Sequence, residues 1–158
     1  MTFSHSDLVD IAEKWLSKKC GFVFKEFSSF AGEIPDAIGF RSRETTIVEC
    51  KVSRSDFFSD SSKYTRRNPE MGVGKYRFFM CATGLIHPSE LPERWGLLYV
   101  NDKGKVRQKV GPTGNDWSKS EFVFSDRNIE WEMDMTYTAL RRLNLRGVIS
   151  LIYDRRMF

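Results

Sequence analysis

Three residues whose types could support hydrolytic chemistry lie in the segment EIPDAIGFRSRETTIVECKVS, residues 33–53. Asp36 stands near the start of one β-like run, and Glu49 and Lys51 stand near the end of the next. The charged turn RSRE between the runs predicts a hairpin, which would bring Asp36 close to Glu49. The surrounding apolar residues predict a buried strand, and burying charged groups is costly. The presence of these three side chains therefore needs a physical reason.

The reason that these residue types suggest is a metal ion and a phosphate. Side chains alternate along a strand, so Glu49 and Lys51 share one face. Two adjacent carboxylates repel each other, and one takes up a proton unless a cation lies between them. Mg²⁺ prefers oxygen ligands and often binds one or two carboxylates together with substrate phosphates. An ammonium group nearby could orient a water molecule or stabilise charge that develops on a phosphate.

A family resemblance rests on these residues. The pattern Pro35-Asp36, twelve intervening residues, then Glu49-Cys50-Lys51 resembles the signature of the PD-(D/E)xK nuclease superfamily. The resemblance implies an α/β fold, with a restriction-endonuclease-like mixed β-sheet core flanked by helices. It also implies that Asp36, Glu49 and the carbonyl group of Cys50 hold Mg²⁺, for which Mn²⁺ can substitute. Lys51 would assist the attacking water.

Two further features belong to the same resemblance. Many members of the superfamily add an acidic residue from the first helix, and Glu13 is the best match here, with Asp10 as the second choice. The stretch ECKVSRSDF, residues 49–57, is also similar to a stretch of MmcB-like DNA-repair proteins, in which a basic loop follows. The looser of the two resemblances is therefore to a DNA-repair or phage accessory protein.

The elements that must position these residues can be predicted from periodicity. A first helix is expected over residues 4–18, with Ser4 as its cap and Asp7 as the partner in a capping box. Strands are expected over residues 22–27, 34–40, 45–53, 76–84 and 96–100, and a basic hairpin strand follows. Residues 54–75 predict a helix and a mobile loop. This order predicts an α/β sandwich around a mixed sheet.

A second long helix is expected over residues 129–143, capped by Asp126 or Asn128. Its predicted core stripe consists of Ile129, Met133, Tyr137 and Leu140. Trp131 and Met135 would then point the other way and need cover. The tail GVISLIY, residues 147–153, is the favoured cover, and a second copy of the chain in a homodimer is the alternative.

Composition sets the outer limits. The chain has 158 residues, which predicts a single nuclease-like domain over residues 1–158. No apolar run approaches the ~20 residues that span a bilayer, so we expect no membrane partner. The N-terminal residues have no basic start and no apolar core of a signal peptide, which predicts a cytoplasmic location. Three cysteines and two histidines fit neither a disulfide framework nor a histidine-rich metal site.

A mild basic excess favours a polyanionic partner. The formal net charge is +4, and basic residues follow the predicted site directly. The expected DNA-binding residues are Arg54, Lys63, Arg66, Arg67, Lys75 and Arg77. Tyr64 and Tyr76 lie among them and could stack on bases. Lys103, Lys105, Arg107 and Lys109 alternate along the later hairpin, either as a phosphate track or as a solvated strand edge that resists aggregation.

Two functions of different classes follow from the sequence. The first is a metal-dependent deoxyribonuclease that recognises DNA structure or ends, because no helix-turn-helix or zinc finger is present to read a long sequence. The second is a DNA-binding repair or phage accessory protein that uses the same fold without catalysis. The plainest alternative for Glu49 and Lys51 is an exposed ion pair on an edge strand, worth about 0.5 kcal/mol. For Asp36 it is a turn residue after proline, and for Glu13 a solvated helix residue.

Overall fold

The computed structural model describes residues 2–154, which build a six-stranded mixed sheet with helices on both faces. The strands are β1 (Phe22–Lys25), β2 (Ala37–Arg41), β3 (Glu44–Cys50), β4 (Tyr76–Ala82), β5 (Trp95–Val100) and β6 (Val106–Val110). They lie in the sheet in chain order. The pairs β3–β4 and β4–β5 are parallel and the other three are antiparallel. The prediction of an α/β fold with a mixed sheet and flanking helices is confirmed.

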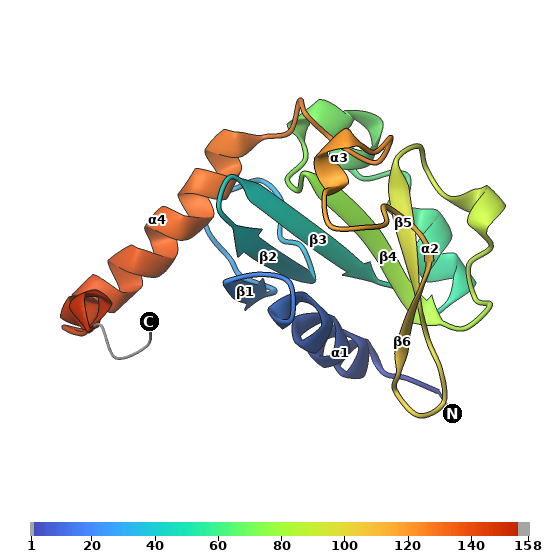
Figure 1. Ribbon diagram of the computed structural model, residues 1–158, viewed down its shortest axis with the longest axis horizontal. Helices are drawn as coiled ribbons and strands as arrows, with labels where there is room; N and C mark the ends of the chain where they lie inside the picture. Colours follow the sequence, from blue (N-terminus) through green and yellow to red (C-terminus); the bar gives the residue numbers. More distant parts are fainter. Residues whose placement is uncertain (1, 155–158) are drawn as a thin grey trace.

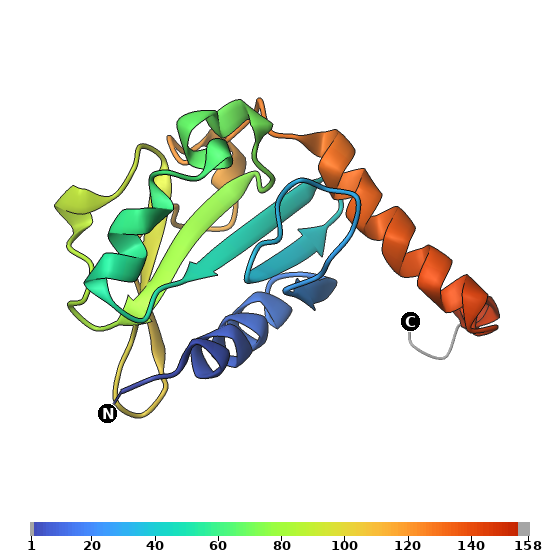
Figure 2. The ribbon, with the colours of Figure 1, turned by 180° about the vertical axis from the view of Figure 1, so that it is seen from behind.

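The parallel strands are buried on both faces, as their sequences predict. Every residue of β5 is buried, and every residue of β4 except the last. One face of the sheet carries α1 (His5–Ser17), whose Leu8, Ala12 and Leu16 pack against Val48 and Met80. Parallel strands need such cover on both sides, because no face of theirs meets water. Figure 2 shows the opposite face, covered by α2 (Arg54–Asp60) and α3 (Tyr64–Arg67).

The first helix begins as its sequence predicts. The Ser4 hydroxyl accepts a hydrogen bond from the Asp7 backbone N–H at 3.1 Å, and the Asp7 carboxylate accepts from the Ser4 N–H at 2.9 Å. This capping box satisfies two backbone donors that the first turn would otherwise leave free. It fixes the start of α1 beside the end of the sheet where β2 begins and β3 ends.

Short helical turns join the remaining elements. They are η1 (Pro69–Met71), η2 (Pro88–Glu90), η3 (Trp117–Lys119) and η4 (Ile149–Tyr153). No helix within residues 2–154 is both long enough and apolar enough to cross a bilayer.

The second long helix, α4 (Ile129–Leu145), exists and is capped by Asn128, but its predicted orientation is wrong. Met135 is fully buried, and Trp131 packs against the same core cluster. The predicted core stripe of Ile129, Met133, Tyr137 and Leu140 is exposed. The 147–153 tail lies at the far end of the helix and does not cover Trp131.

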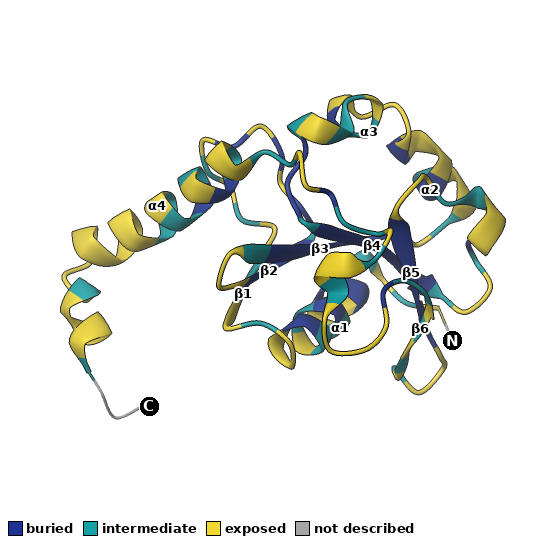
Figure 3. Cartoon of the chain, turned by 45° about the horizontal axis from the view of Figure 1, so that its top comes forward, coloured by how far each residue is buried: buried dark blue, intermediate teal, exposed yellow. Residues whose placement is uncertain are grey.

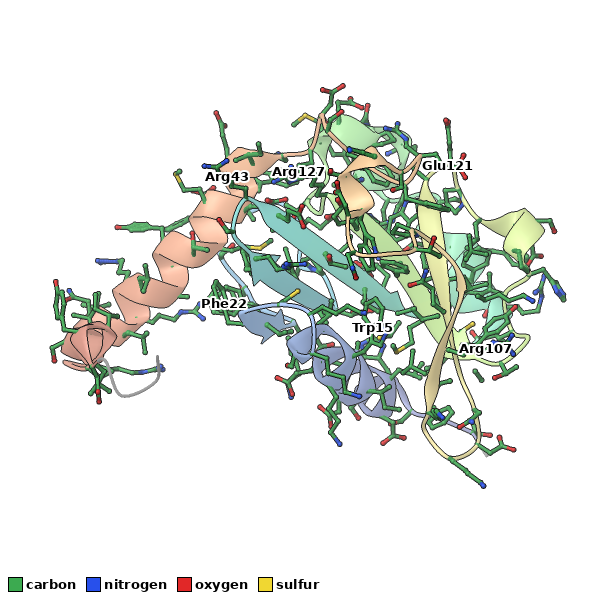
Figure 4. All side chains as sticks on the ribbon, in the orientation of Figure 1. Trp15, Phe22, Arg43, Arg107, Glu121 and Arg127 are labelled. Carbon is green, nitrogen blue, oxygen red and sulfur yellow. The ribbon has the colours of Figure 1, made fainter. Side chains whose placement is uncertain are left out.

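The cause is a polar anchor that hydrophobic periodicity does not register. The Glu132 carboxylate is buried and accepts hydrogen bonds from the Thr45 hydroxyl at 2.8 Å and the Gly74 N–H at 2.9 Å. Arg127 also donates to it at 3.1 Å, and a second Arg127 N–H donates to the Arg43 carbonyl at 3.0 Å. Figure 4 shows the Arg43 and Arg127 side chains together where α4 begins. This anchor turns the Trp131 and Met135 face inward.

The corrected orientation predicts that two methionines of one helix contribute unequally to the free energy of unfolding. Replacing buried Met135 by alanine removes packed atoms and should cost about 2–5 kcal/mol in the free energy of unfolding. Replacing Met133, which is 68% exposed, should cost less than about 0.5 kcal/mol. Urea denaturation of both variants measures the difference. Equal costs, or a larger cost at Met133, would restore the orientation predicted from the sequence.

Candidate active site

The hairpin register brings the two predicted carboxylates together. The last β2–β3 pair is Ala37 with Val48, and one step beyond it Asp36 stands opposite Glu49. Asp36 Oδ2 accepts a hydrogen bond of 2.7 Å from the Cys50 backbone N–H. Burial raises the pKa of Asp36, although this hydrogen bond and nearby cations oppose the shift. The side chain is therefore fixed at the point where the strands separate.

Glu49 is a buried carboxylate without a hydrogen bond from the described part of the chain. Its side chain is only 3% exposed, and its closest cationic atoms are Arg66 Nη2 at 3.2 Å and Lys63 Nζ at 3.5 Å. Burial, and then the charge of Asp36, raise the pKa of Glu49 to about 7. Arg66 and Lys63 oppose this shift without cancelling it. A further cation close to such a carboxylate would stabilise its ionised form and lower its pKa.

Lys51 is buried on the same side of the sheet as Glu49. Its ammonium nitrogen lies 2.9 Å from Asp60 Oδ1, at the end of α2, and the Lys63 ammonium lies 2.9 Å from the same oxygen. Lys63 links the two neighbourhoods, since it contacts both Asp60 and Glu49. Neither ammonium is aligned for a hydrogen bond to Asp60 Oδ1. Their attraction to it is electrostatic.

Arg66 ties this cluster to α3. Its guanidinium donates to Asp60 Oδ2 at 2.7 Å and to Glu33 Oε2 at 3.1 Å. Burial alone would raise the pKa of Asp60, but Arg66, Lys51 and Lys63 hold it below its ordinary value. Among the side chains shielded from solvent, the four carboxylates of Glu33, Asp36, Glu49 and Asp60 therefore meet three cations, and Asp56, which is 37% exposed, lies outside this group at 4.0 Å from Lys51. With all of them ionised, the cluster carries one net negative charge.

A cavity of about 280 Å³ opens over Glu49. Glu33, Lys63 and Arg66 line it together with Glu49, so both signs of charge face the space. Tyr64 stands at its edge with a 54% exposed side chain. The buried carboxylate is thus reachable from outside the fold.

Sequence reasoning missed several members of this region. His5 Nε2 lies 2.9 Å from Glu26 Oε1 and 3.4 Å from Asp36 Oδ1, which makes a second group of potential ligands on the other side of Asp36. Glu33 has no sequence signal, because it precedes the strand in an irregular loop. Asp60 follows buried Phe57 by three residues, so both fall on one face of α2, and that spacing could have indicated it.

Glu13 does not join the carboxylates. Its side chain pairs with Lys25 at 3.3 Å, and Asp10 pairs with the same lysine at 3.0 Å. Glu13 lies eight residues beyond His5, or about 12 Å further along α1. The helix therefore presents its first turn, and not its third, to Asp36.

The predicted DNA-binding residues separate into different environments. Arg77 is 1% exposed, donates to the carbonyl groups of Gly74 and Pro69, and stacks on the Phe124 ring at 3.8 Å. Its prediction as a surface contact is wrong, because its charge is used to hold the 69–74 turn. The other residues behave as follows: Arg66 is buried in the site, Lys63 lines its cavity, Arg54 pairs with Glu90, Lys75 pairs with Glu44, and Arg67 is exposed.

A larger cavity of about 530 Å³ lies at the opposite end of β2 and β3, against Lys18, Arg41 and Trp117. It has no part in the carboxylate cluster. Its acidic members are engaged elsewhere, Glu44 with Lys75 and Asp116 with the Ser118 hydroxyl and N–H. The chemistry of Asp36 and Glu49, and not cavity size, therefore locates the candidate active site.

Comparisons with known proteins give information on the fold alone. No protein-family model and no curated protein matches the sequence. Among solved structures, a protein of unknown function from Silicibacter pomeroyi, SPO1766, is similar over 92% of this chain and 94% of its own. The TM-score is 0.57 and the sequence identity is 19%. The similarity shows that the fold over most of this chain has a counterpart of nearly the same length.

The raised pKa of Glu49 predicts a specific pH dependence of stability. The folded state keeps Glu49 protonated up to about pH 7, whereas the unfolded chain releases that proton near its ordinary pKa of 4.5. The free energy of unfolding therefore falls as pH rises from about 4.5 to 7. The loss is on the order of 3 kcal/mol. Glu49→Gln cannot ionise and should gain stability relative to wild type between pH 5 and pH 8.

Urea denaturation at several pH values measures this gain. Glu121→Gln is the matched control, because Glu121 is exposed and its variant should follow the wild-type curve. If the Glu49→Gln and wild-type curves stay parallel from pH 5 to pH 8, Glu49 ionises normally in the folded protein and the assignment is wrong.

The buried ion pairs predict a large cost when one partner is removed. Asp60→Asn removes the negative charge that Lys51 and Lys63 share and should destabilise the protein by about 3–5 kcal/mol. Asp10→Asn removes an exposed partner of Lys25 and should cost less than about 1 kcal/mol. Thermal unfolding monitored by circular dichroism compares the two. Similar small losses would show that the cluster is solvated and not buried.

Proposed function

We propose that this protein is a metal-dependent nuclease that hydrolyses phosphodiester bonds in DNA. The observation that carries the proposal is the buried Glu49 carboxylate, which receives no hydrogen bond from residues 2–154, stands opposite Asp36 and opens onto a cavity. Structural carboxylates in protein interiors are normally hydrogen-bonded. A pair of carboxylates with raised pKa values, of which Glu49 lacks such a partner within residues 2–154, is typical of a site where an added cation and an anionic substrate complete the charge balance.

The residues present fit a divalent cation. Asp36 and Glu49 offer carboxylate oxygens, and the Cys50 carbonyl between Glu49 and Lys51 offers a third oxygen, a set that suits Mg²⁺ or Mn²⁺. The Cys50 thiol lies on the opposite, α1-covered face, and burial raises its pKa, so it stays neutral and does not serve as a ligand. Such a cation would polarise a phosphoryl oxygen and lower the pKa of a bound water.

The chain's own cations suit the substrate. Lys51, Lys63 and Arg66 gather around the Glu49 side of the site. Fixed positive groups in a partly desolvated site stabilise the negative charge that develops on a phosphate during hydrolysis. We assign to Lys51 the role of orienting the attacking water, and to Lys63 and Arg66 the binding of phosphate oxygens.

The surroundings of the cavity favour DNA recognition by structure or ends. Tyr64 presents an exposed ring at the cavity edge, where it can stack on a base irrespective of sequence. Arg67 and Arg54, on the same α2–α3 segment, supply charge for the backbone, and such contacts position a nucleic acid without specifying its sequence. We propose that the protein acts in the cytoplasm, in DNA repair or as part of a phage or mobile element.

One observation favours the second candidate, a DNA-binding accessory protein without catalysis. Lys63 and Arg66 already lie within 3.5 Å of the Glu49 carboxylate, so the site can neutralise itself without a metal ion. In that case the fold would bind DNA electrostatically, with an affinity that falls with salt and survives removal of divalent ions.

Cleavage assays with divalent ions test the proposal. The wild-type protein is incubated with single-stranded, duplex, nicked and branched DNA and with RNA, in Mg²⁺, Mn²⁺ or EDTA. We expect cleavage of DNA in either metal and none in EDTA. Asp36→Asn, Glu49→Gln and Lys51→Met should each lower the rate at least about 100-fold, because each removes a metal-binding or water-orienting group.

Glu13→Gln is the matched control, since it changes an acidic residue that pairs with Lys25 away from the carboxylates, and it should cleave at the wild-type rate. Melting temperatures measured with and without Mn²⁺ give a second readout, because an ion that binds only the folded state raises the wild-type value. No cleavage of any substrate, together with DNA binding that persists in EDTA, would establish the accessory role. A Glu13→Gln variant as inactive as the others would overturn the assignment of ligands.

A further inference from the structure

The larger cavity, on the α1 side of the sheet, is lined by basic side chains that have no acidic partner. It lies between the C-terminal end of α1, the β2–β3 turn and the segment that leads into η3, and its volume is about 530 Å³. Figure 3 shows α1 and the exposed η3 turn close together on this side. Lys18, Lys19 and Arg41 line the cavity, and within residues 2–154 none of them forms an ion pair.

The charges around this cavity leave an excess of two positive charges. Its acidic members are Glu44, which pairs with Lys75 at 3.4 Å, and Asp116. The Asp116 carboxylate accepts hydrogen bonds from the Ser118 hydroxyl and N–H. Four cations stand against these two carboxylates, namely Lys18, Lys19, Arg41 and Lys75. A phosphomonoester carries a charge of about −1.5 to −2 at pH 7 and would balance the excess.

Aromatic surface adjoins the basic side chains. The Lys19 ammonium nitrogen lies 5.0 Å from the centroid of the Trp15 ring and 5.6 Å from that of the Trp117 ring. Both rings attract the cation and help to keep it at the cavity wall. Trp117 itself lines the cavity and is half-buried, so part of its ring is open to a ligand. An anion that also carries a flat apolar group would therefore meet suitable surface for both parts.

A buried hydroxyl behind the cavity wall lacks a partner. Tyr76 stands opposite Thr46, which lines the cavity, and its ring lies edge-on to Trp117 with the centroids 5.2 Å apart. The Tyr76 hydroxyl makes no hydrogen bond in the described part of the chain. Burial, and then the charges of Glu44 and Asp116, raise the pKa of Tyr76 to about 12, so the hydroxyl stays protonated. Buried donors normally have an acceptor, and a ligand beside Thr46 and Trp117 would supply one.

We propose that this cavity binds a nucleoside monophosphate, with the phosphate group on Arg41 and Lys18 and the base against Trp117. The planar guanidinium of Arg41 can donate two parallel hydrogen bonds to one phosphate group. A volume of about 530 Å³ is more than a phosphate ion needs and lies within the range of small-molecule sites. The charge excess, the aromatic wall and the volume thus agree on one class of ligand.

This site is separate from the carboxylate cluster. Thr46 lies on the same face of β3 as Val48, which packs against α1, whereas Glu49 lies on the other face beside Arg66. Glu44 is also five residues from Glu49, or about 17 Å along the strand. The proposal therefore does not depend on the nuclease activity.

Isothermal titration calorimetry of the full chain with deoxyadenosine monophosphate (dAMP), in EDTA, tests the proposal. We expect one site with a Kd below about 1 mM. Deoxyadenosine and inorganic phosphate should each bind at least about tenfold more weakly, because each keeps only one part of the ligand. Arg41→Ala and Lys18→Ala should each weaken dAMP binding at least about tenfold, because each removes charge-assisted hydrogen bonds to the phosphate.

Matched controls separate this site from general effects of charge. Arg107→Ala and Lys14→Ala each remove one positive charge at an exposed position outside the cavity and should bind dAMP as wild type does. Tryptophan fluorescence gives a second readout. Addition of dAMP should change the emission of wild type, and most of that change should be lost in Trp117→Phe.

The outcomes decide the proposal. No binding of dAMP at concentrations up to about 5 mM would overturn it. Inorganic phosphate that binds as tightly as dAMP would overturn the assignment of a nucleoside. Unchanged affinity in both Arg41→Ala and Lys18→Ala would show that dAMP binds elsewhere. Because dAMP has no phosphodiester bond and EDTA removes divalent ions, failure of the nuclease proposal would leave this result intact.

Discussion

The desolvation of Glu49 is the constraint on which the rest of this site depends. A carboxylate that is 3% exposed and accepts no hydrogen bond from the described residues loses hydration that nothing in its own strand replaces. The ammonium group of Lys63 and the guanidinium of Arg66, both from the α3 region, lie close to this carboxylate and compensate its charge. Those cations need counterions of their own, which explains why Asp60 and Glu33 are buried with them. One buried charge on β3 thereby fixes the docking of α2, α3 and the 33–36 segment.

Two polar anchors of the same kind hold the two ends of β3. At its C-terminal end the Glu49 cluster attaches α2 and α3, and at its N-terminal end Thr45 hydrogen-bonds to Glu132 of α4. Glu132 also accepts from the Gly74 N–H, so α4 is attached to the turn that precedes β4. These contacts are directional, whereas apolar packing tolerates rotation of a helix about its axis. The orientation of α4 is therefore set by one carboxylate, and an apolar face remains outside.

The sequence predicts those parts of the molecule that obey a single local period. The capping box of α1, the β2–β3 hairpin and the buried β4 and β5 strands follow from patterns within ten or fifteen residues, and all of them are present. The opposition of Asp36 and Glu49 also follows, because hairpin register carries a residue before one strand to a residue near the end of the next. The environments of Glu13 and Arg77 do not follow from such local patterns. Their partners, Lys25 and the 69–74 turn, are set by tertiary packing.

Whether the basic residues predicted to bind DNA are exposed or buried depends on tertiary packing. Arg66 and Arg77 lie in a stretch that looks solvated, yet both are buried, because carboxylates and carbonyl groups distant in sequence satisfy them. A basic stretch of sequence therefore indicates that positive charge is needed there, but it does not show whether that charge binds a nucleic acid or groups of the protein itself. In the Glu49 cluster the protein itself uses the positive charge, and the proposed nuclease activity would use it a second time. Four carboxylates against three cations leave one negative charge in a partly closed space. A proton on Glu49 compensates it and leaves the site electrically neutral. In the proposed nuclease, a divalent ion held by Asp36 and Glu49 would compensate it instead, and the excess positive charge would attract a phosphate.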